Sequence, residues 1–262
     1  MNIDLSNKNA LVCGSTQGIG KATAMELAEL GANVTLLARN EDKLKKVLQE
    51  LPKNNSQKHQ FLVADFQDLT KLKEVVSNYL KEVETIHILV NNTGGPAGGP
   101  VFSASIDEFD KAFTLHLKAN HLLVQTVVPS MKKAGFGRIV NMISTSVKQP
   151  LDGLGVSNTI RGAVANWAKT LANELGQFGI TVNNVLPGAT ATSRLKQIID
   201  NKASKLNKKV EDVEDVMRNQ IPLKRFANPQ EIANAVAFLS SEAASYINGI
   251  NLPVDGGRTK SL

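Results

Sequence analysis

Short apolar segments alternate with longer amphipathic segments along the whole chain, and this alternation constrains the fold more than any other feature. The apolar segments cover residues 9–14, 33–38, 60–64, 87–91, 138–143, 180–186 and 250–254. Segments with helical spacing lie between them, over residues 19–30, 41–51, 68–83, 105–133, 155–178 and 229–239. Strands that are apolar throughout are buried on both faces, as in a parallel sheet covered by helices on both sides. The pattern predicts an α/β fold, a single doubly wound parallel sheet of about seven strands with helices on both faces.

The domain organisation follows from the even composition. The 262 residues contain no Pro/Ser-rich linker, no composition break and no internal repeat. We therefore expect one domain over residues 1–262. Residues 189–222 are more polar than the rest and have helical spacing, so they predict a helical insertion between the sixth strand and the last helix.

Composition excludes several classes of protein. The single cysteine, Cys13, rules out an internal disulfide and a cysteine-based zinc site, and we predict no metal site. No run approaches ~18 apolar residues and no signal peptide is visible, so we expect a cytoplasmic protein with no membrane partner. We attribute the net charge of +6 to a lysine-rich surface and expect no nucleic-acid partner, because the most charged region, 194–218, balances seven basic with five acidic residues.

A glycine-rich loop joins the first predicted strand to the first predicted helix. Gly14, Gly18 and Gly20 follow the spacing G-x-x-x-G-x-G. Glycines at such a place allow a sharp turn and let the backbone approach a pyrophosphate, while the helix that follows points its N–H groups at the anion. The loop predicts a dinucleotide site; the alternative is a purely structural turn.

Several motifs in their order along the chain resemble those of the short-chain dehydrogenase/reductase family, in its beta-ketoacyl carrier-protein reductase-like branch. They are the glycine loop, Asp65 after the third strand, Asn-Asn-Thr-Gly at 91–94, Pro187-Gly188 after the sixth strand, and Val-Asp-Gly-Gly at 254–257. The resemblance covers essentially all 262 residues. It implies a Rossmann-type fold that binds a nicotinamide dinucleotide and acts on a carbonyl/alcohol pair, for which a 3-oxoacyl compound is one possibility.

The resemblance also implies which residues hold the cofactor. Asp65 would bond the adenine amino group with the Phe66 backbone beside it, and Thr192 would reach the nicotinamide amide or its phosphate. The full predicted set is Gly14, Ser15, Gln17, Gly18, Ile19, Gly20, Arg39, Asp65, Phe66, Asn91, Gly94, Arg161, Pro187, Gly188 and Thr192.

The end of the second strand indicates which dinucleotide is preferred. It reads Leu-Ala-Arg-Asn at 37–40, with no carboxylate to bond an adenosine ribose and with Arg39 placed for a 2′-phosphate. We predict NADP(H) in preference to NAD(H). Gln17 stands where many NADP-preferring members of the family carry a second basic residue, so Arg39 is the sole obvious phosphate partner; alternatively it is a surface charge at the start of a helix.

The catalytic positions depart from the family pattern, which uses an Asn, a Ser, a Tyr and a Lys. Ser144 matches, but Ser157 stands at the tyrosine position, Arg161 at the lysine position and His116 at the asparagine position. A serine hydroxyl needs an adjacent base to exchange a proton near neutral pH, and arginine cannot be that base. Arg161 could still bond the ribose hydroxyls.

Two residues could replace the missing acid. His116 titrates in the right range, and Lys148 lies in a loop expected to border the pocket, where partial desolvation would lower the pKa of a lysine. Each has an ordinary structural alternative, a helix histidine and a loop lysine. The sequence does not choose between them.

Three functions remain open at this level. The first is an NADP(H)-dependent oxidoreductase with a changed proton donor, because hydride transfer relies mainly on the cofactor. The second is an NADP(H)-binding sensor or partner protein without turnover. The third is another reaction in the same pocket, such as dehydration or isomerisation.

Two further expectations concern the substrate and the assembly. Residues 189–222 should cover a small carbonyl or alcohol substrate as a lid, with an apolar lining from Leu195, Ile198, Ile199 and Leu206. Members of this branch pair two long helices across a two-fold axis, here 107–133 and 155–178, so we expect a homotetramer or homodimer. The apolar positions proposed for that interface are Leu122, Val128, Val164 and Trp167.

Overall fold

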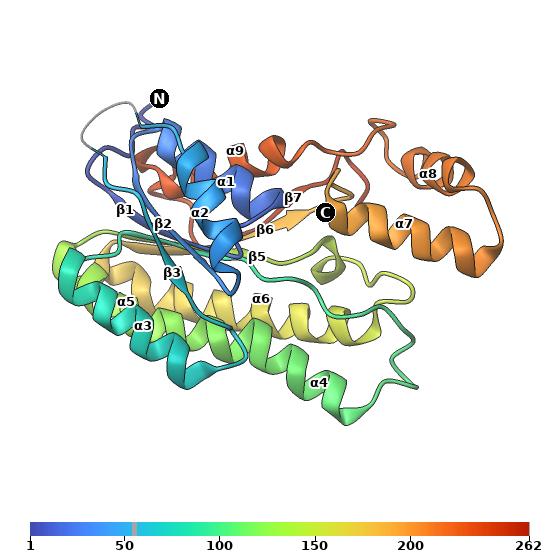
Figure 1. Cartoon of the computed structure of the whole chain (residues 1–262), viewed down its shortest axis with the longest axis horizontal. Helices are drawn as coiled ribbons and strands as arrows, with labels where there is room; N and C mark the ends of the chain where they lie inside the picture. The colour runs from blue at the N-terminus through green and yellow to red at the C-terminus, as the bar shows by residue number, and fades with distance from the viewer. Residues whose placement is uncertain (54–56, 262) are drawn as a thin grey trace.

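The chain forms one parallel sheet of seven strands (Figure 1). The structure, a computed structural model, describes residues 1–53 and 57–261. The strands are β1 (Asn9–Cys13), β2 (Asn33–Ala38), β3 (Gln60–Val63), β4 (Ile88–Asn91), β5 (Gly137–Met142), β6 (Ile180–Pro187) and β7 (Asn251–Val254). Their order across the sheet is β3-β2-β1-β4-β5-β6-β7, and every neighbouring pair is parallel. This confirms the predicted doubly wound, Rossmann-type fold, in which the order reverses between β1 and β4 and ligands bind beyond the carboxyl ends of the strands.

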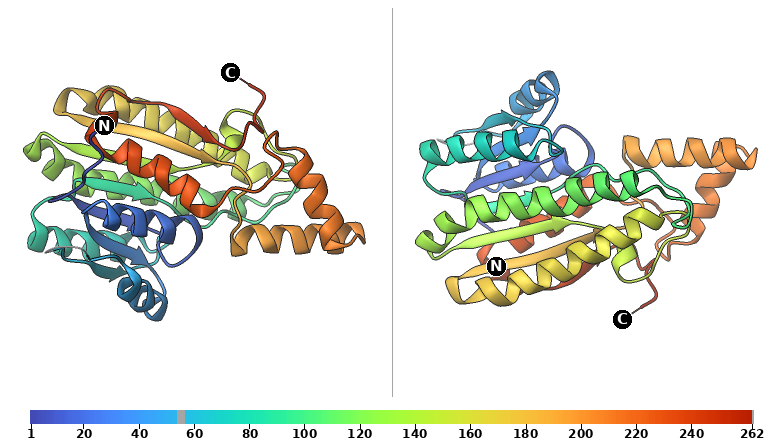
Figure 2. Two further views of the ribbon diagram at one scale, coloured as in Figure 1. Left: turned by 90° about the horizontal axis from the view of Figure 1, so that it is seen from above. Right: turned by 90° about the horizontal axis from the view of Figure 1, so that it is seen from below.

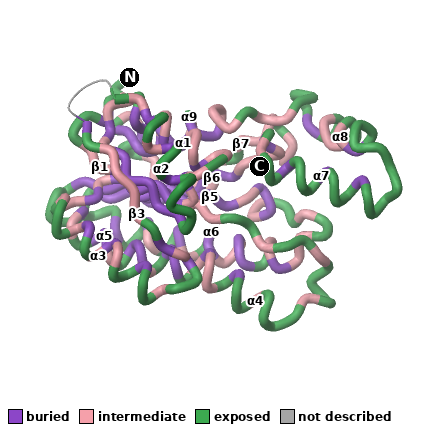
Figure 3. The backbone as a smooth tube through the Cα atoms, viewed as in Figure 1, coloured by how far each residue is buried: buried purple, intermediate pink, exposed green. Residues whose placement is uncertain are grey.

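Helices cover both faces of the sheet (Figure 2). On one face α1 (Gly18–Glu29), α2 (Glu41–Glu50) and α9 (Pro229–Ser240) pack through one hydrophobic cluster. On the other, α3 (Leu69–Val83), α5 (Ala119–Ala134) and α6 (Gly155–Leu175) pack through a second. The buried backbone in Figure 3 follows the sheet, as expected for strands enclosed between two helical layers.

The helix predicted over 105–133 is interrupted. It consists of α4 (Ile106–Phe113), a π-helical segment η1 (Thr114–Lys118) and α5. A capping box begins α4, since the Ser105 hydroxyl and the Glu108 carboxylate bond each other's backbone N–H groups. Pro129 lies inside α5 without ending it. Single π-helical turns are frequent at functional sites, and η1 carries the candidate residue His116.

The predicted insertion at 189–222 is helical and stands beyond one end of the sheet (Figure 1). It holds α7 (Ser193–Leu206) and α8 (Val210–Asn219), which pack on each other through Leu195, Ile199 and Val213. Ile199 therefore packs on α8 and does not line a substrate pocket, because that face of α7 is used for the helix pair. Leu206 is 51% exposed.

Two of the four residues predicted for a subunit interface belong to the core of the single chain. Val128 is 8% exposed and Val164 is fully buried, each within a hydrophobic cluster beneath the sheet. The prediction for these two residues was wrong because their side chains pack on the inner faces of α5 and α6. Leu122 and Trp167 remain half-buried on the same helices and are still available for an interface.

A row of asparagines crosses four neighbouring strands. Asn91 Nδ2 donates to Asn141 Oδ1 at 2.8 Å, and Asn141 Nδ2 donates to Asn184 Oδ1 at 2.9 Å. Asn184 Nδ2 then donates to Asn251 Oδ1 at 2.8 Å. The four are direct partners in the strand register, so β4, β5, β6 and β7 are tied together beneath the carboxyl edge.

Within the described residues, no helix is both long and apolar enough to cross a bilayer.

The described residues also contain three single turns of 3₁₀-helix. They are η2 (Thr145–Val147), η3 (Gly176–Phe178) and η4 (Glu242–Ala244). Of these, η2 bears on the site, because it begins directly after Ser144 at the end of β5.

Candidate active site

The glycine loop forms a tight turn between β1 and α1. Gly14 and Gly18 have φ angles of +59° and +55°, which favour glycine. A Cβ on Gly20 would lie 2.2 Å from the carbonyl oxygen of Gly14, so this turn admits no side chain there. Asn92 Nδ2 bonds the carbonyl oxygens of Cys13 and Gly14, each at 3.2 Å, and joins the loop to the end of β4.

The start of α1 is suited to an anion. Its N-cap residue, Gln17, makes no side-chain cap, and the first turn contains no acidic residue. The hydroxyl of Ser15 is used inside the protein, where it accepts from the backbone N–H of Leu37 at 3.1 Å. The backbone N–H groups of the first turn and the positive end of the helix dipole are thus left for a bound group, and they fit a pyrophosphate.

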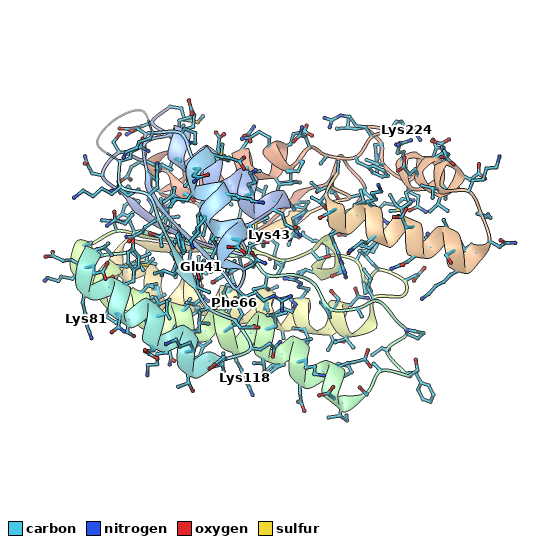
Figure 4. The ribbon with its side chains drawn as sticks, in the orientation of Figure 1. Glu41, Lys43, Phe66, Lys81, Lys118 and Lys224 are labelled. Carbon is cyan, nitrogen blue, oxygen red and sulfur yellow. The ribbon has the colours of Figure 1, made fainter. Side chains whose placement is uncertain are left out.

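The predicted adenosine end lies beside the edges of β2 and β3. Arg39 Nη1 is 3.8 Å from Asp65 Oδ2, and the Arg39 side chain is 80% exposed, so the guanidinium can turn toward a ligand. Phe66 is 8% exposed and its side chain lies between the sheet and the helices below (Figure 4), which leaves only its backbone for binding. Asn91 is 2% exposed and belongs to the asparagine row. Its side chain therefore orders the strand ends, and the predicted contact of Asn91 with the cofactor stays a prediction that would use its backbone.

A cleft of about 1360 Å³ opens at the carboxyl edge of the sheet. The predicted residues Ile19, Ser144, Pro187, Gly188 and Thr192 line it. Its walls otherwise come from residues 97–100, 149–154, 189–190, one face of α7, the end of α8 with the segment that follows it, and residues 258–260. Leu195 and Ile198 line it as predicted, whereas Ile199 and Leu206 are absent from its wall.

Thr192 joins the glycine loop to the start of α7. Its hydroxyl accepts from the backbone N–H of Leu195 at 3.3 Å and caps the helix. A Cβ on Gly18 would lie 3.2 Å from Thr192 Cγ2, so the cap stands directly against the loop. Arg194, one residue into α7, donates from Nη2 to the carbonyl oxygen of Pro96 at 2.9 Å. This bond links α7 to the loop after β4, and nothing in the sequence pattern indicated it.

His116 is enclosed behind the cleft. It is 1% exposed, its Nδ1 lies 2.7 Å from the hydroxyl of Thr93, and its Nε2 has no hydrogen-bond partner in the described structure. Burial, with a further contribution from the charge of Arg161, lowers the pKa of His116 to about 2. The imidazole is therefore neutral near pH 7 and holds no imidazolium proton to donate. This argues against the expectation that His116 replaces the catalytic acid.

Arg161 is a buried cation. It is 8% exposed, and its Nη1 donates to the carbonyl oxygen of Met142 at 2.9 Å. Within residues 1–53 and 57–261 no carboxylate forms an ion pair with it. Burial lowers the pKa of Arg161 to about 10, so the guanidinium still carries its charge at neutral pH.

Ser144 lies two residues beyond the carbonyl that Arg161 binds. The Ser144 hydroxyl oxygen accepts from the backbone N–H of Ser146 at 3.1 Å, which fixes the side chain and leaves its proton free to reach a substrate oxygen. Gly95 brings the loop after β4 close as well, because a Cβ there would be 3.9 Å from Arg161 Nη2. Tertiary structure thus brings Arg161 next to the ends of β4 and β5; of these residues Ser144 lines the cleft and Arg161 does not.

The two remaining candidates, Ser157 and Lys148, lie outside the lining of the cleft. Ser157 is half-buried on α6, one turn before Arg161, and is not among the residues lining the cleft. Lys148 follows η2 and is half-buried; the neighbouring residues Thr145 and Gln149 line the cleft, but Lys148 does not. Thr93, which pairs with His116, is a functional neighbour that the sequence reading missed, although it is the third residue of the Asn-Asn-Thr-Gly motif.

Comparison with known proteins agrees with this architecture. The family described as enoyl-(acyl carrier protein) reductase matches residues 14–259. The 3-oxoacyl-[acyl-carrier-protein] reductase FabG of Staphylococcus epidermidis is 33% identical over 254 residues, covering 96% of this chain and 98% of the relative. The NADPH-dependent reductase BacG of Bacillus subtilis is 30% identical, with 98% and 100% covered. The structure of L-sorbose reductase from Gluconobacter frateurii with NADPH and L-sorbose superposes with a TM-score of 0.93 at 30% identity, covering both chains fully. The chain therefore belongs to the short-chain dehydrogenase/reductase family.

Proposed function

We propose that the protein is an NADP(H)-dependent oxidoreductase that acts on a small carbonyl/alcohol pair. The observation that carries the proposal is one continuous cleft, lined by Ile19 at the uncapped start of α1 and by Ser144 at the end of β5. A dinucleotide seated on the glycine loop would extend toward Ser144 along this edge of the sheet. The two reductases and the sorbose reductase named above support this reaction class, and the FabG relative makes a 3-oxoacyl compound one candidate substrate.

The preference for NADP(H) over NAD(H) is supported by Arg39. It stands at the end of β2, 80% exposed and only loosely paired with Asp65. Its planar group can bind a phosphate with two hydrogen bonds, and no carboxylate follows β2 at 37–40 to repel that phosphate.

A bound nicotinamide would supply the hydride, and the residues of this chain have other tasks. The Ser144 hydroxyl donates to the carbonyl oxygen of the substrate. Arg161 holds a positive charge behind this corner, where it stabilises negative charge that develops on the oxygen. Ser157 stands at the position of the family's tyrosine and leaves a small polar space. The proton therefore reaches the substrate oxygen through water. Lys148 is the remaining side chain that is a candidate donor of that proton. Residues 189–222 serve as the lid.

A second candidate function is an NADP(H)-binding sensor or partner protein without turnover. The neutral state of His116 favours it, because the structure then offers one fewer acid than the sequence suggested. Loss of a general acid typically slows a reaction about 10²–10⁴-fold, which leaves a measurable rate in the first function.

One pair of measurements separates these functions. NADPH binding is followed by the change in its fluorescence, and NADPH oxidation by absorbance against a panel of ketones and aldehydes. Tight binding with oxidation by at least one carbonyl supports the oxidoreductase. Tight binding with no oxidation across the panel supports the sensor, and absence of binding contradicts both.

A further inference from the structure

The cleft carries a strong excess of positive charge. Six basic side chains line it and one acidic side chain, Asp152, opposes them. The basic residues are Arg194, Lys202, Lys205, Lys224, Arg258 and Lys260. We infer that the substrate of this protein is anionic, with a carboxylate or phosphate that lies under α7 at the end away from the reacting carbon. The inference rests on the proposed function and adds a substrate class to it.

The arrangement of α7 concentrates these charges in the cleft. Its residues at 194, 197, 198, 201, 202 and 205 follow helical spacing and line the cleft, while the residues at 199 and 203 form the face packed on α8 and Leu195 contacts both. Acidic residues of α8 could neutralise the lysines, but none of them lines the cleft. Two of them, Glu214 and Asp215, pair with Arg218 on the same helix.

The six basic side chains that line the cleft form no ion pairs with carboxylates of the described residues. Arg194 bonds the Pro96 carbonyl oxygen, Lys224 Nζ donates to the Asn219 carbonyl oxygen at 2.9 Å, and Arg258 Nη2 to Gln220 Oε1 at 3.3 Å. Lys224 lies on the segment after α8 (Figure 4). Lys202, Lys205 and Lys260 have neither an ion pair nor a hydrogen bond through their ammonium groups within the part of the chain that the structure describes. A concave wall that carries charge of one sign raises the local concentration of ligands with the opposite charge.

The positions along α7 give the scale of the substrate. Thr192 stands at the glycine loop, and Lys202 follows ten residues later, which is about 15 Å along a helix axis. The anionic end therefore lies on the order of 10–15 Å from the site of hydride transfer. A medium-length oxo acid spans this distance, and so does a carrier thioester with a phosphate on its arm.

Matched acid and ester pairs test the charge requirement directly. The protein is loaded with NADP⁺ and titrated calorimetrically with 11-oxododecanoate, whose keto and carboxylate carbons are ten bonds apart, and with its methyl ester, and kcat/KM is measured with NADPH for the same pair. We expect the acid to bind about tenfold more tightly than the ester, with a difference that shrinks as salt is added. Equal affinities for acid and ester, together with equal affinities for the two thioesters described below, would overturn the inference.

Two double variants locate the effect. Lys202→Gln with Lys205→Gln should weaken binding of the acid about tenfold and leave the ester within twofold. Lys196→Gln with Lys208→Gln removes the same charge from exposed positions that do not line the cleft, and should change neither. An equal loss in both double variants, or an equal loss for acid and ester, contradicts a charge site under α7.

Two thioesters distinguish whether the anionic group that the protein recognises is a phosphate or a carboxylate. Acetoacetyl-coenzyme A carries phosphates and acetoacetyl-N-acetylcysteamine does not. If the lysine variants weaken the coenzyme A thioester selectively, the recognised group is a phosphate; if they weaken the oxo acid selectively, it is a carboxylate. Because the calorimetric arm needs no turnover, selective binding without reaction would disprove the proposed function and keep the anion site.

Discussion

Burial and the positive charge of Arg161 together hold the imidazole of His116 neutral, with a pKa lowered to about 2. The histidine hydrogen-bonds Thr93 on one side and leaves Nε2 enclosed on the other. The residue that sequence alone suggests as an acid is therefore a neutral group beside a buried cation. The charged member of this corner is Arg161.

The first prediction concerns stability in acid. The pKa of His116 is about 2 in the folded chain and about 6.5 when unfolded, so the unfolded state binds the additional proton. Stability is complete above pH 6.5 and declines as pH falls toward 2. Between pH 6.5 and 5 the loss from His116 is about 2 kcal/mol. Urea unfolding at several pH values should show a shallower acid dependence in His116→Asn. The exposed His121, replaced by Asn, is the control, and an unchanged slope in His116→Asn would contradict a buried neutral imidazole.

The second prediction concerns cofactor choice. Arg39→Ala removes a charge-assisted contact worth about 1.5–3 kcal/mol, so NADPH affinity should fall roughly 10–150-fold. NADH lacks the 2′-phosphate and should bind nearly as before. Fluorescence titration of both cofactors measures the difference, with Lys43→Ala on the exposed side of α2 as the control. Equal losses for NADPH and NADH would disprove the role of Arg39.

The third prediction concerns Ser157 and Arg161, the positions at which the family resemblance leads us to expect a tyrosine and a lysine. Ser157→Tyr with Arg161→Lys should raise kcat/KM for simple carbonyl compounds, and either change alone should do less, because the two groups act as a unit. NADPH oxidation at fixed cofactor saturation measures this.

Two further variants test the proton route of the native protein. Lys148→Ala should reduce kcat if this lysine donates the proton, whereas His116→Ala should leave the pH profile unchanged in shape. If both variants keep the full rate between pH 6 and 9, neither side chain donates the proton, and water is the remaining proton source.

The fourth prediction concerns the asparagine row. Asn141→Leu keeps the side-chain size but leaves Asn91 Nδ2 and Asn184 Oδ1 without their partners inside the sheet. Each buried polar group left unsatisfied costs about 1–3 kcal/mol, so the free energy of unfolding should fall by roughly 2–5 kcal/mol. Asn234→Leu, at an exposed position of α9, should change it by no more than about 0.5 kcal/mol. Similar effects of the two substitutions in urea unfolding would show that the row contributes little.

The fifth prediction concerns assembly. We expect a homotetramer or homodimer formed by α5 and α6, with Leu122 and Trp167 on the contact faces. Light scattering at micromolar concentration should give at least twice the chain mass of 28.2 kDa. Replacing both residues by aspartate should shift the mass toward the monomer, and a monomeric native protein would disprove the interface.

The sheet and the glycine loop could be predicted because their signals are local. Wholly apolar runs determine strands buried on both faces, and the spacing of Gly14, Gly18 and Gly20 determines a turn that permits no side chain. The two helices of the insertion were also predictable, since α7 and α8 each have one apolar face. In each case neighbours within a few residues decide the conformation.

Tertiary structure decided what depends on residues far apart in the chain. Val128 and Val164 look equally suited to an interface or a core in the sequence, and only the packing of α5 and α6 against the sheet assigns them to the core. The ionisation of His116 depends on burial and on Arg161, which is 45 residues away in sequence. In the same way, residues 194–218 are nearly balanced in charge as a sequence, yet folding turns Lys202 and Lys205 of α7 into the cleft and leaves the carboxylates of α8 outside its wall. Protonation and charge segregation depend on solvent exposure and on distance in space, and sequence spacing alone supplies neither.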